Sequence, residues 1–84
     1  MTLKTPLLKL LEKTYEPETI VDLQFARYDL SFKTDEDGRA ILLFIGKRGP
    51  TGKIRGERFR RVRQADAHGR VIKDYWERKG EATP

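Results

Sequence analysis

The sequence predicts one small α+β domain, in which a short N-terminal helix packs on an antiparallel meander of about four strongly bent strands. A barrel-like sheet is a variant of the same plan. Three observations support this fold class: leucines at helical spacing near the N-terminus, a change to period-two alternation after residue 20, and glycine-containing turns between the alternating runs. With 84 residues and no cysteine, the chain has room for one core and no disulfide to stabilise it.

The helix is predicted from a leucine stripe with spacing i, i+4, i+7 and i+8, as a helix lying on a sheet requires. Thr5-Pro6 favours the helix start, because threonine can cap free amides and proline is tolerated in the first turn. Glu16-Pro17 is expected to end it, since the residue before proline is disfavoured in the α region. The stripe consists of Leu3, Leu7, Leu10 and Leu11.

Residues 20–32 alternate in polarity, but the phase slips at Ala26-Arg27. A β-bulge in one bent strand is the simplest interpretation, and two strands broken at that point are the alternative. Asp35 to Gly38 has the Asp-Gly signature of a hairpin turn. The run after it, residues 39–45, is apolar on both faces, so we expect a central strand covered by the helix on one side and by sheet curvature or a second subunit on the other.

The second half of the chain is expected to contain a loop, two strands and a tight turn. The loop covers residues 46–52, the strands cover 53–63 and 71–77, and the turn is Asp66 to Gly69. Residues 1–79 then form the domain. Residues 80–84 lack apolar side chains other than alanine and are expected to be a frayed tail.

The longest apolar run, residues 40–45, is far shorter than the roughly 20 residues that a membrane-spanning helix needs. Lys9 interrupts the N-terminal apolar run and no small-residue cleavage site follows it, so we interpret it as a helix of the mature protein. We therefore expect a cytoplasmic protein without a membrane partner. The lack of cysteine fits a reducing compartment.

The positive charge is concentrated in one segment. Residues 46–65 hold eight basic side chains and one acid, Glu57, so this segment carries +7 whereas the whole chain carries +5. Arginine predominates, and its planar guanidinium binds phosphate through two parallel hydrogen bonds and stacks on bases. The sequence therefore predicts binding of RNA or DNA, or another polyanion. The predicted binding residues are Lys47, Arg48, Lys53, Arg55, Arg58, Arg60, Arg61 and Arg63.

Strand alternation divides these residues between two faces. Arg55, Arg61 and Arg63 are expected to share a face with Phe59, whereas Arg58 and Arg60 belong to the other face. Glycines of the 46–52 loop add backbone donors. Phe59, Tyr75 and Trp76 would offer stacking surfaces if they are exposed, although aromatic residues in strands are more often part of a core.

A second hypothesis is an interaction or assembly module, in which the basic strand binds an acidic protein or the sheet pairs with a second copy to give a homodimer. A third gives the basic strand no role beyond solubility and protection of a sheet edge. A polyanion-binding surface requires the basic side chains to converge in three dimensions.

Several motifs resemble catalytic or metal sites but lack essential residues. The 46–54 segment has lysine where a phosphate-binding P-loop has its first glycine, and Ile54 replaces the magnesium-binding hydroxyl. The Asp35 turn lacks the further ligands of a calcium loop, and one histidine, His68, is too few for zinc. Ser31, the single serine, has no histidine near it in the predicted fold. We therefore expect a protein that is not an enzyme and has no cofactor or metal.

Overall fold

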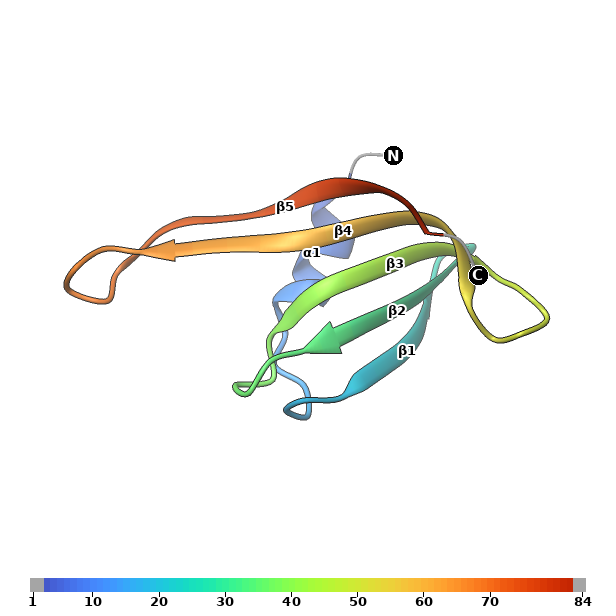
Figure 1. The fold of residues 1–84 in the computed structure, drawn as a ribbon, viewed down its shortest axis with the longest axis horizontal. Coiled ribbons are helices and arrows are strands. Elements are labelled where there is room, and N and C mark those ends of the chain that lie inside the picture. Colours follow the sequence, from blue (N-terminus) through green and yellow to red (C-terminus); the bar gives the residue numbers. More distant parts are fainter. Residues whose placement is uncertain (1–2, 83–84) are drawn as a thin grey trace.

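The computed structural model describes residues 3–82, which form one helix followed by five antiparallel strands in the order β1-β2-β3-β4-β5 (Figure 1). The predicted fold class is confirmed, with five strands in place of four and with an open sheet rather than a barrel. Among the described residues, no helix is long and apolar enough to cross a bilayer. The elements are α1 (Thr5–Glu12), β1 (Ile20–Phe25), β2 (Tyr28–Thr34), β3 (Ala40–Arg48), β4 (Ile54–Ala65) and β5 (Val71–Ala82).

The additional strand arises at Ala26-Arg27, where the chain reverses in a two-residue turn. Phe25 pairs with Tyr28, and Ala26 has φ 53°, the positive value typical of turns that match the twist of a sheet. The bulge prediction is wrong and the alternative of two strands is correct. The reversal places both apolar sets on one face of a hairpin, for example Leu23 opposite Leu30.

Helix α1 ends at Glu12, four residues before the predicted end, and Lys4 occupies the N-cap position without a side-chain cap. The chain leaves the helix early because Tyr15 contacts the β2–β3 turn. Its amide donates to the carbonyl of Gly38 at 2.8 Å, and its hydroxyl donates to the carbonyl of Leu10 at 2.8 Å. The helix end is thereby satisfied by a side chain that lies beyond it.

The three longer hairpins use the same turn, although their sequences differ. In each, the first turn residue donates its amide to the carbonyl four positions later, at 2.8–2.9 Å, and a glycine at the fourth position has a positive φ. The turns begin at Asp35, Gly49 and Asp66. β3 extends to Arg48, so the predicted 46–52 loop is reduced to the second of these turns.

The core lies between α1 and one face of the sheet, which we call the helix face. Thr34 is the buried polar residue of the described core, at 1% exposed. Its hydroxyl donates to the carbonyl of Glu16 at 2.7 Å and accepts from the amide of Thr19 at 2.9 Å, which holds the segment before β1 on the sheet. The buried apolar cluster is Leu7, Leu11, Leu30, Phe32, Ala40, Leu43, Ile45 and Phe59.

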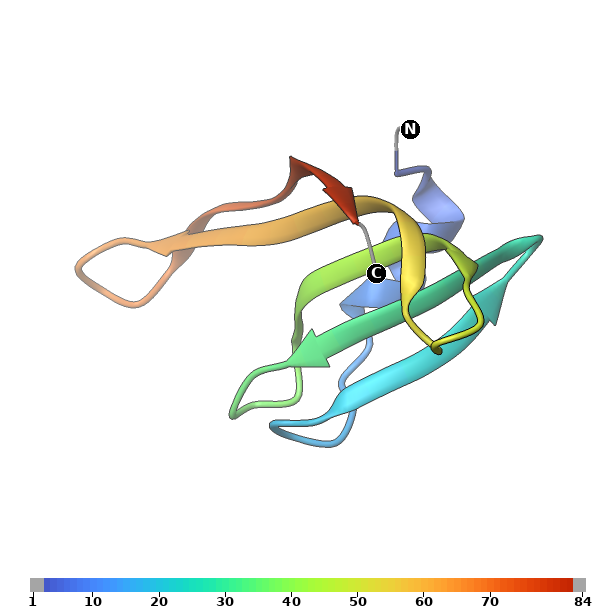
Figure 2. The ribbon, with the colours of Figure 1, turned by 45° about the vertical axis from the view of Figure 1, so that its right-hand side comes forward.

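The sheet bends where Gly46 of β3 faces Gly56 of β4 (Figure 2). A Cβ atom at Gly46 would lie 2.1 Å from the carbonyl oxygen of Arg55, and one at Gly56 would lie 2.1 Å from that of Ile45. The two strands therefore approach more closely here than any other residue type allows. As a result, the first part of β4 curves over the face opposite α1.

β4 and β5 continue beyond the rest of the sheet as a two-stranded arm. β3 pairs with β4 as far as Leu42↔Arg60, and past that point β4 pairs only with β5 (Figure 1). We call residues 61–76 the β4–β5 arm, because Arg61 pairs with Trp76; it contributes to a longest dimension of 46 Å. At the other end, β5 runs past the predicted limit to Ala82, so residues 80–82 of the expected tail are paired with β4 and residues 83–84 lie outside the described part.

Candidate nucleic-acid interface

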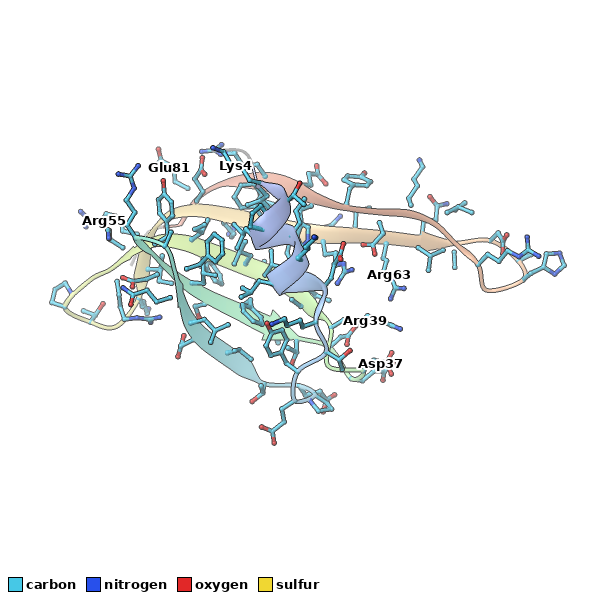
Figure 3. The ribbon with its side chains drawn as sticks, turned by 180° about the vertical axis from the view of Figure 1, so that it is seen from behind. Lys4, Asp37, Arg39, Arg55, Arg63 and Glu81 are labelled. Atoms are coloured by element: carbon cyan, nitrogen blue, oxygen red, sulfur yellow. The ribbon has the colours of Figure 1, made fainter. Side chains whose placement is uncertain are left out.

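The eight predicted binding residues do not converge on one face. As the alternation predicts, Arg55, Arg61 and Arg63 lie on the helix face, and Arg58 and Arg60 lie on the opposite face, which we call the helix-free face. Even on one face they are dispersed, since Arg55 and Arg63 lie at opposite ends of the sheet (Figure 3). The total of +7 in the sequence therefore overstates the charge at any one place.

Arg61 is a structural residue. Its guanidinium donates to both carboxylate oxygens of Asp74, from Nε at 2.7 Å and from Nη2 at 2.8 Å, and its side chain is only 10% exposed. It also lies 5.9 Å from the ring centroid of Trp76, and Arg63 reaches the same carboxylate at 3.6 Å. The hydrogen bonds from Arg61 hold the pKa of Asp74 below its usual range, against the opposing effect of burial.

Arg48 and Lys47 are tethered at the β3–β4 turn. The Arg48 guanidinium lies 3.3 Å from a carboxylate oxygen of Asp22, and its backbone amide donates to Asp29 at 2.8 Å. The Lys47 ammonium donates to the carbonyl of Arg27. These contacts join the β3–β4 turn to β1 and β2, so Lys47 and Arg48 both help to hold the turn in place.

The remaining cations of the set are exposed and have no carboxylate within 4 Å among residues 3–82. Arg58 makes one long contact, at 3.4 Å, to the carbonyl of Lys79. Lys53 lies in the β3–β4 turn and Arg55 lies on the helix face. Arg58 and Arg60 therefore form the part of the predicted site that is both free and grouped.

The helix-free face places apolar side chains beside Arg58 and Arg60. Cross-strand partners lie side by side on one face, so two rows can be followed across the sheet. The first runs from Arg60 through Leu42 to Lys33, and the second from Arg58 through Phe44 to Ser31. Lys33 on β2 is exposed and lacks an ion pair in the described part of the chain, so it adds a third free cation to this face.

A hollow of about 510 Å³ lies beside Phe44 on the helix-free face. Ile20 and Ile54 contribute apolar walls, Lys53 contributes a cationic group, and Arg48 lines the hollow together with its ion-pair partner Asp22. It exists because the bend at Gly56 brings the start of β4 over the sheet. An aromatic ring, apolar walls and nearby cations together suit a flat, partly apolar group attached to an anion.

Comparison of the chain with models of known protein families, with curated proteins and with solved structures found no match. The functional interpretation therefore depends on the geometry of the chain itself.

The predicted stacking residues are only partly available. Phe59 is 4% exposed and belongs to the core, and Trp76 is half-buried beside Arg61. Tyr75 is 49% exposed and lies on the helix-free face opposite Val62. Phe44 was not among the predicted aromatics, although its place in a run that is apolar on both faces was a signal that one side of it would face away from the core.

The remaining motifs considered in the sequence, His68 and the glycine-rich segment after β3, are ordinary parts of turns and strands. His68 is exposed in the β4–β5 turn, where its amide donates to Asp66 at 2.9 Å. Within residues 3–82 no three histidine, cysteine or acidic side chains are grouped so that they could hold a metal. The glycine-rich segment after β3 leads into a strand, as predicted, and not into a helix.

Proposed function

We propose that this protein is a non-enzymatic binding domain whose helix-free face holds single-stranded nucleic acid. The observation that carries the proposal is the pair Arg58 and Arg60, exposed and without a carboxylate partner among the described residues, on the same face as Phe44. Lys33 lies on the far side of Leu42 in the same sheet face. The helix-free face therefore presents cationic side chains around an aromatic ring.

Such a surface suits a single strand better than a duplex. Guanidinium groups bind phosphates and release counterions, while an exposed or half-exposed ring stacks on a base that is not paired. Phe44 and the neighbouring hollow can receive a base, and Arg58 and Arg60 are then near its phosphates. Tyr75 is a second exposed ring on the same face, opposite Val62 and therefore two same-face positions farther along β4 than Arg58.

The test compares two double variants with equal loss of charge. Arg58→Gln/Arg60→Gln removes the free cations of the helix-free face, whereas Arg55→Gln/Arg70→Gln removes two exposed cations elsewhere, whose side chains make no hydrogen bond or ion pair within residues 3–82. Fluorescence anisotropy with a labelled oligouridylate at low salt should show an affinity loss of about tenfold or more for the first variant and a much smaller loss for the second.

Phe44→Leu separates stacking from charge, because it keeps an apolar side chain and removes the ring. We expect weaker binding of oligouridylate and unchanged binding of heparin, which offers no base to stack. Equal losses in the two double variants would contradict a defined surface. Binding of polyglutamate with no binding of oligouridylate would overturn the proposal in favour of an acidic protein partner.

A further inference from the structure

The outer edge of β5 is free, and part of it is regular enough to pair with another strand. β5 lies at the end of the sheet order, so its outward backbone groups have no partner within the described sheet. Two bulges interrupt it, at Ile72 and at Lys79, where the pairing with β4 skips one residue. Between them, Lys73 to Arg78 is an unbroken stretch.

The side chains of this stretch are self-complementary. Lys73, Tyr75 and Glu77 share the helix-free face, because their partners Gln64, Val62 and Arg60 do. The side chain of Lys73 has no hydrogen bond or ion pair among the described residues, and that of Glu77 has one partly exposed contact, to Lys79 at 3.6 Å. In an antiparallel pairing centred on Tyr75, a lysine of each strand falls opposite a glutamate of the other.

Within residues 3–82, the β4–β5 arm is supported only at its base, where Arg61 donates to the Ala40 carbonyl at 3.4 Å and Trp76 packs against the core. Past Arg60 it is a ribbon of two strands, and such ribbons are marginally stable in water without further packing. It carries exposed apolar side chains, with Val71 at 46% and Ile72 at 57% exposed. A strand added along β5 would convert the ribbon into a three-stranded sheet.

We propose that two copies of this chain associate by antiparallel pairing of their β5 strands about a two-fold axis at Tyr75. Lys73 of each copy then faces Glu77 of the other, and the two Tyr75 side chains meet at the axis. The arm of one copy runs beside the part of β5 that covers the core of the other. The result is a continuous ten-stranded sheet.

This pairing leaves both helix-free faces on the same side of the combined sheet, because a two-fold axis normal to a sheet preserves its faces. Arg58 and Arg60 of both copies would then lie on one surface. The inference stands on the β5 edge alone and does not depend on the proposed binding of nucleic acid.

Charge reversal tests the register, with sedimentation equilibrium as the measurement. Lys73→Glu and Glu77→Lys each place like charges opposite one another twice, so each should raise the dimer dissociation constant about tenfold or more. The double variant Lys73→Glu/Glu77→Lys restores opposite charges and should return the constant to within about threefold of the original. Circular dichroism of each variant checks that the monomer remains folded.

Cysteine substitution tests the axis, and the chain offers a clean background because it has no cysteine. Tyr75→Cys places two thiols opposite each other at the axis, within the Cα separation that a disulfide allows. We expect rapid oxidation to a covalent dimer, and much slower oxidation of Ile72→Cys, which is equally exposed but faces Arg78 of the second copy. A monomer at all concentrations, or a dimer that the single reversals do not weaken and the double does not restore, would overturn the proposal.

Discussion

Arg60 and Arg61 are adjacent in β4, yet their surroundings differ in every respect that matters for binding. Arg61 is 10% exposed at its side chain and donates two hydrogen bonds to Asp74. To bind a phosphate it would have to give up both hydrogen bonds and leave the partly buried carboxylate with only the 3.6 Å contact to Arg63, which costs more than the new contact gains. The Arg60 side chain is exposed and makes no hydrogen bond or ion pair within residues 3–82, although Glu77 is its cross-strand partner, so it can bind an anion without breaking a contact.

The pair Arg61–Asp74 should make the fold sensitive to acid. Because the pKa of Asp74 is lower in the folded chain than in the unfolded chain, its contribution is present above about pH 4 and is lost as the pH falls further. Asp74→Asn should therefore lower the free energy of unfolding by about 1–2 kcal/mol at pH 7. The difference from the unmodified protein should shrink below about pH 4 in urea titrations at several pH values. A difference that stays constant with pH would contradict this role of the carboxylate.

Ala26 is the first residue of the β1–β2 turn and has a positive φ of 53°. An L-residue with a side chain is disfavoured in that region by about 1–2 kcal/mol, whereas glycine is not. Ala26→Gly should therefore raise the free energy of unfolding by up to about 1 kcal/mol, after the larger entropy of the unfolded glycine is deducted. Thermal unfolding should show a midpoint a few degrees higher. A lower midpoint would mean that the Ala26 methyl group makes a contact worth more than the strain.

At the scale of elements, sequence patterns correctly predicted the features that are set by residues close together in the chain. The leucine stripe indicated α1, and the Asp-Gly and His-Gly pairs indicated hairpin turns that the structure contains. The end of α1 was wrong because it is set by Tyr15 and its contact with the distant Gly38. A bulge was preferred at Ala26-Arg27 because both bulge and reversal change the phase, and neither residue is typical of a two-residue turn.

The bend between β3 and β4 requires a close approach of the two strands, and adding one methyl group at Gly46 tests this requirement. Gly46→Ala would place a Cβ atom 2.1 Å from the carbonyl oxygen of Arg55, so the strands must separate. We expect a loss of about 1–3 kcal/mol in the free energy of unfolding, measured by urea denaturation. Gly49→Ala is the matched control, because its Cβ atom would meet its nearest neighbour at 3.5 Å. Its effect should remain within about 0.5 kcal/mol.

At the scale of the whole molecule, the candidate surface combines side chains from β2, β3 and β4, and sequence analysis found only the β4 part of it. Charge counting located Arg58 and Arg60 because they lie within one dense segment. It could not find Lys33, which is 25 residues before Arg58 in the sequence and reaches the same face only through the strand register. Nor could it separate the free arginines from Arg48 and Arg61, whose acidic partners lie on other strands.

The dependence of binding on salt should distinguish the two faces of the molecule. Each phosphate contact to a single strand contributes about 0.7 to the slope of log affinity against log salt concentration. Arg60→Gln should reduce that slope by about this amount, because Arg60 is a free cation of the helix-free face. Arg55→Gln removes an equally exposed charge from the helix face and should leave the slope unchanged. Equal reductions in both variants would mean that the nucleic acid responds to the net charge of the protein and not to the surface around Phe44.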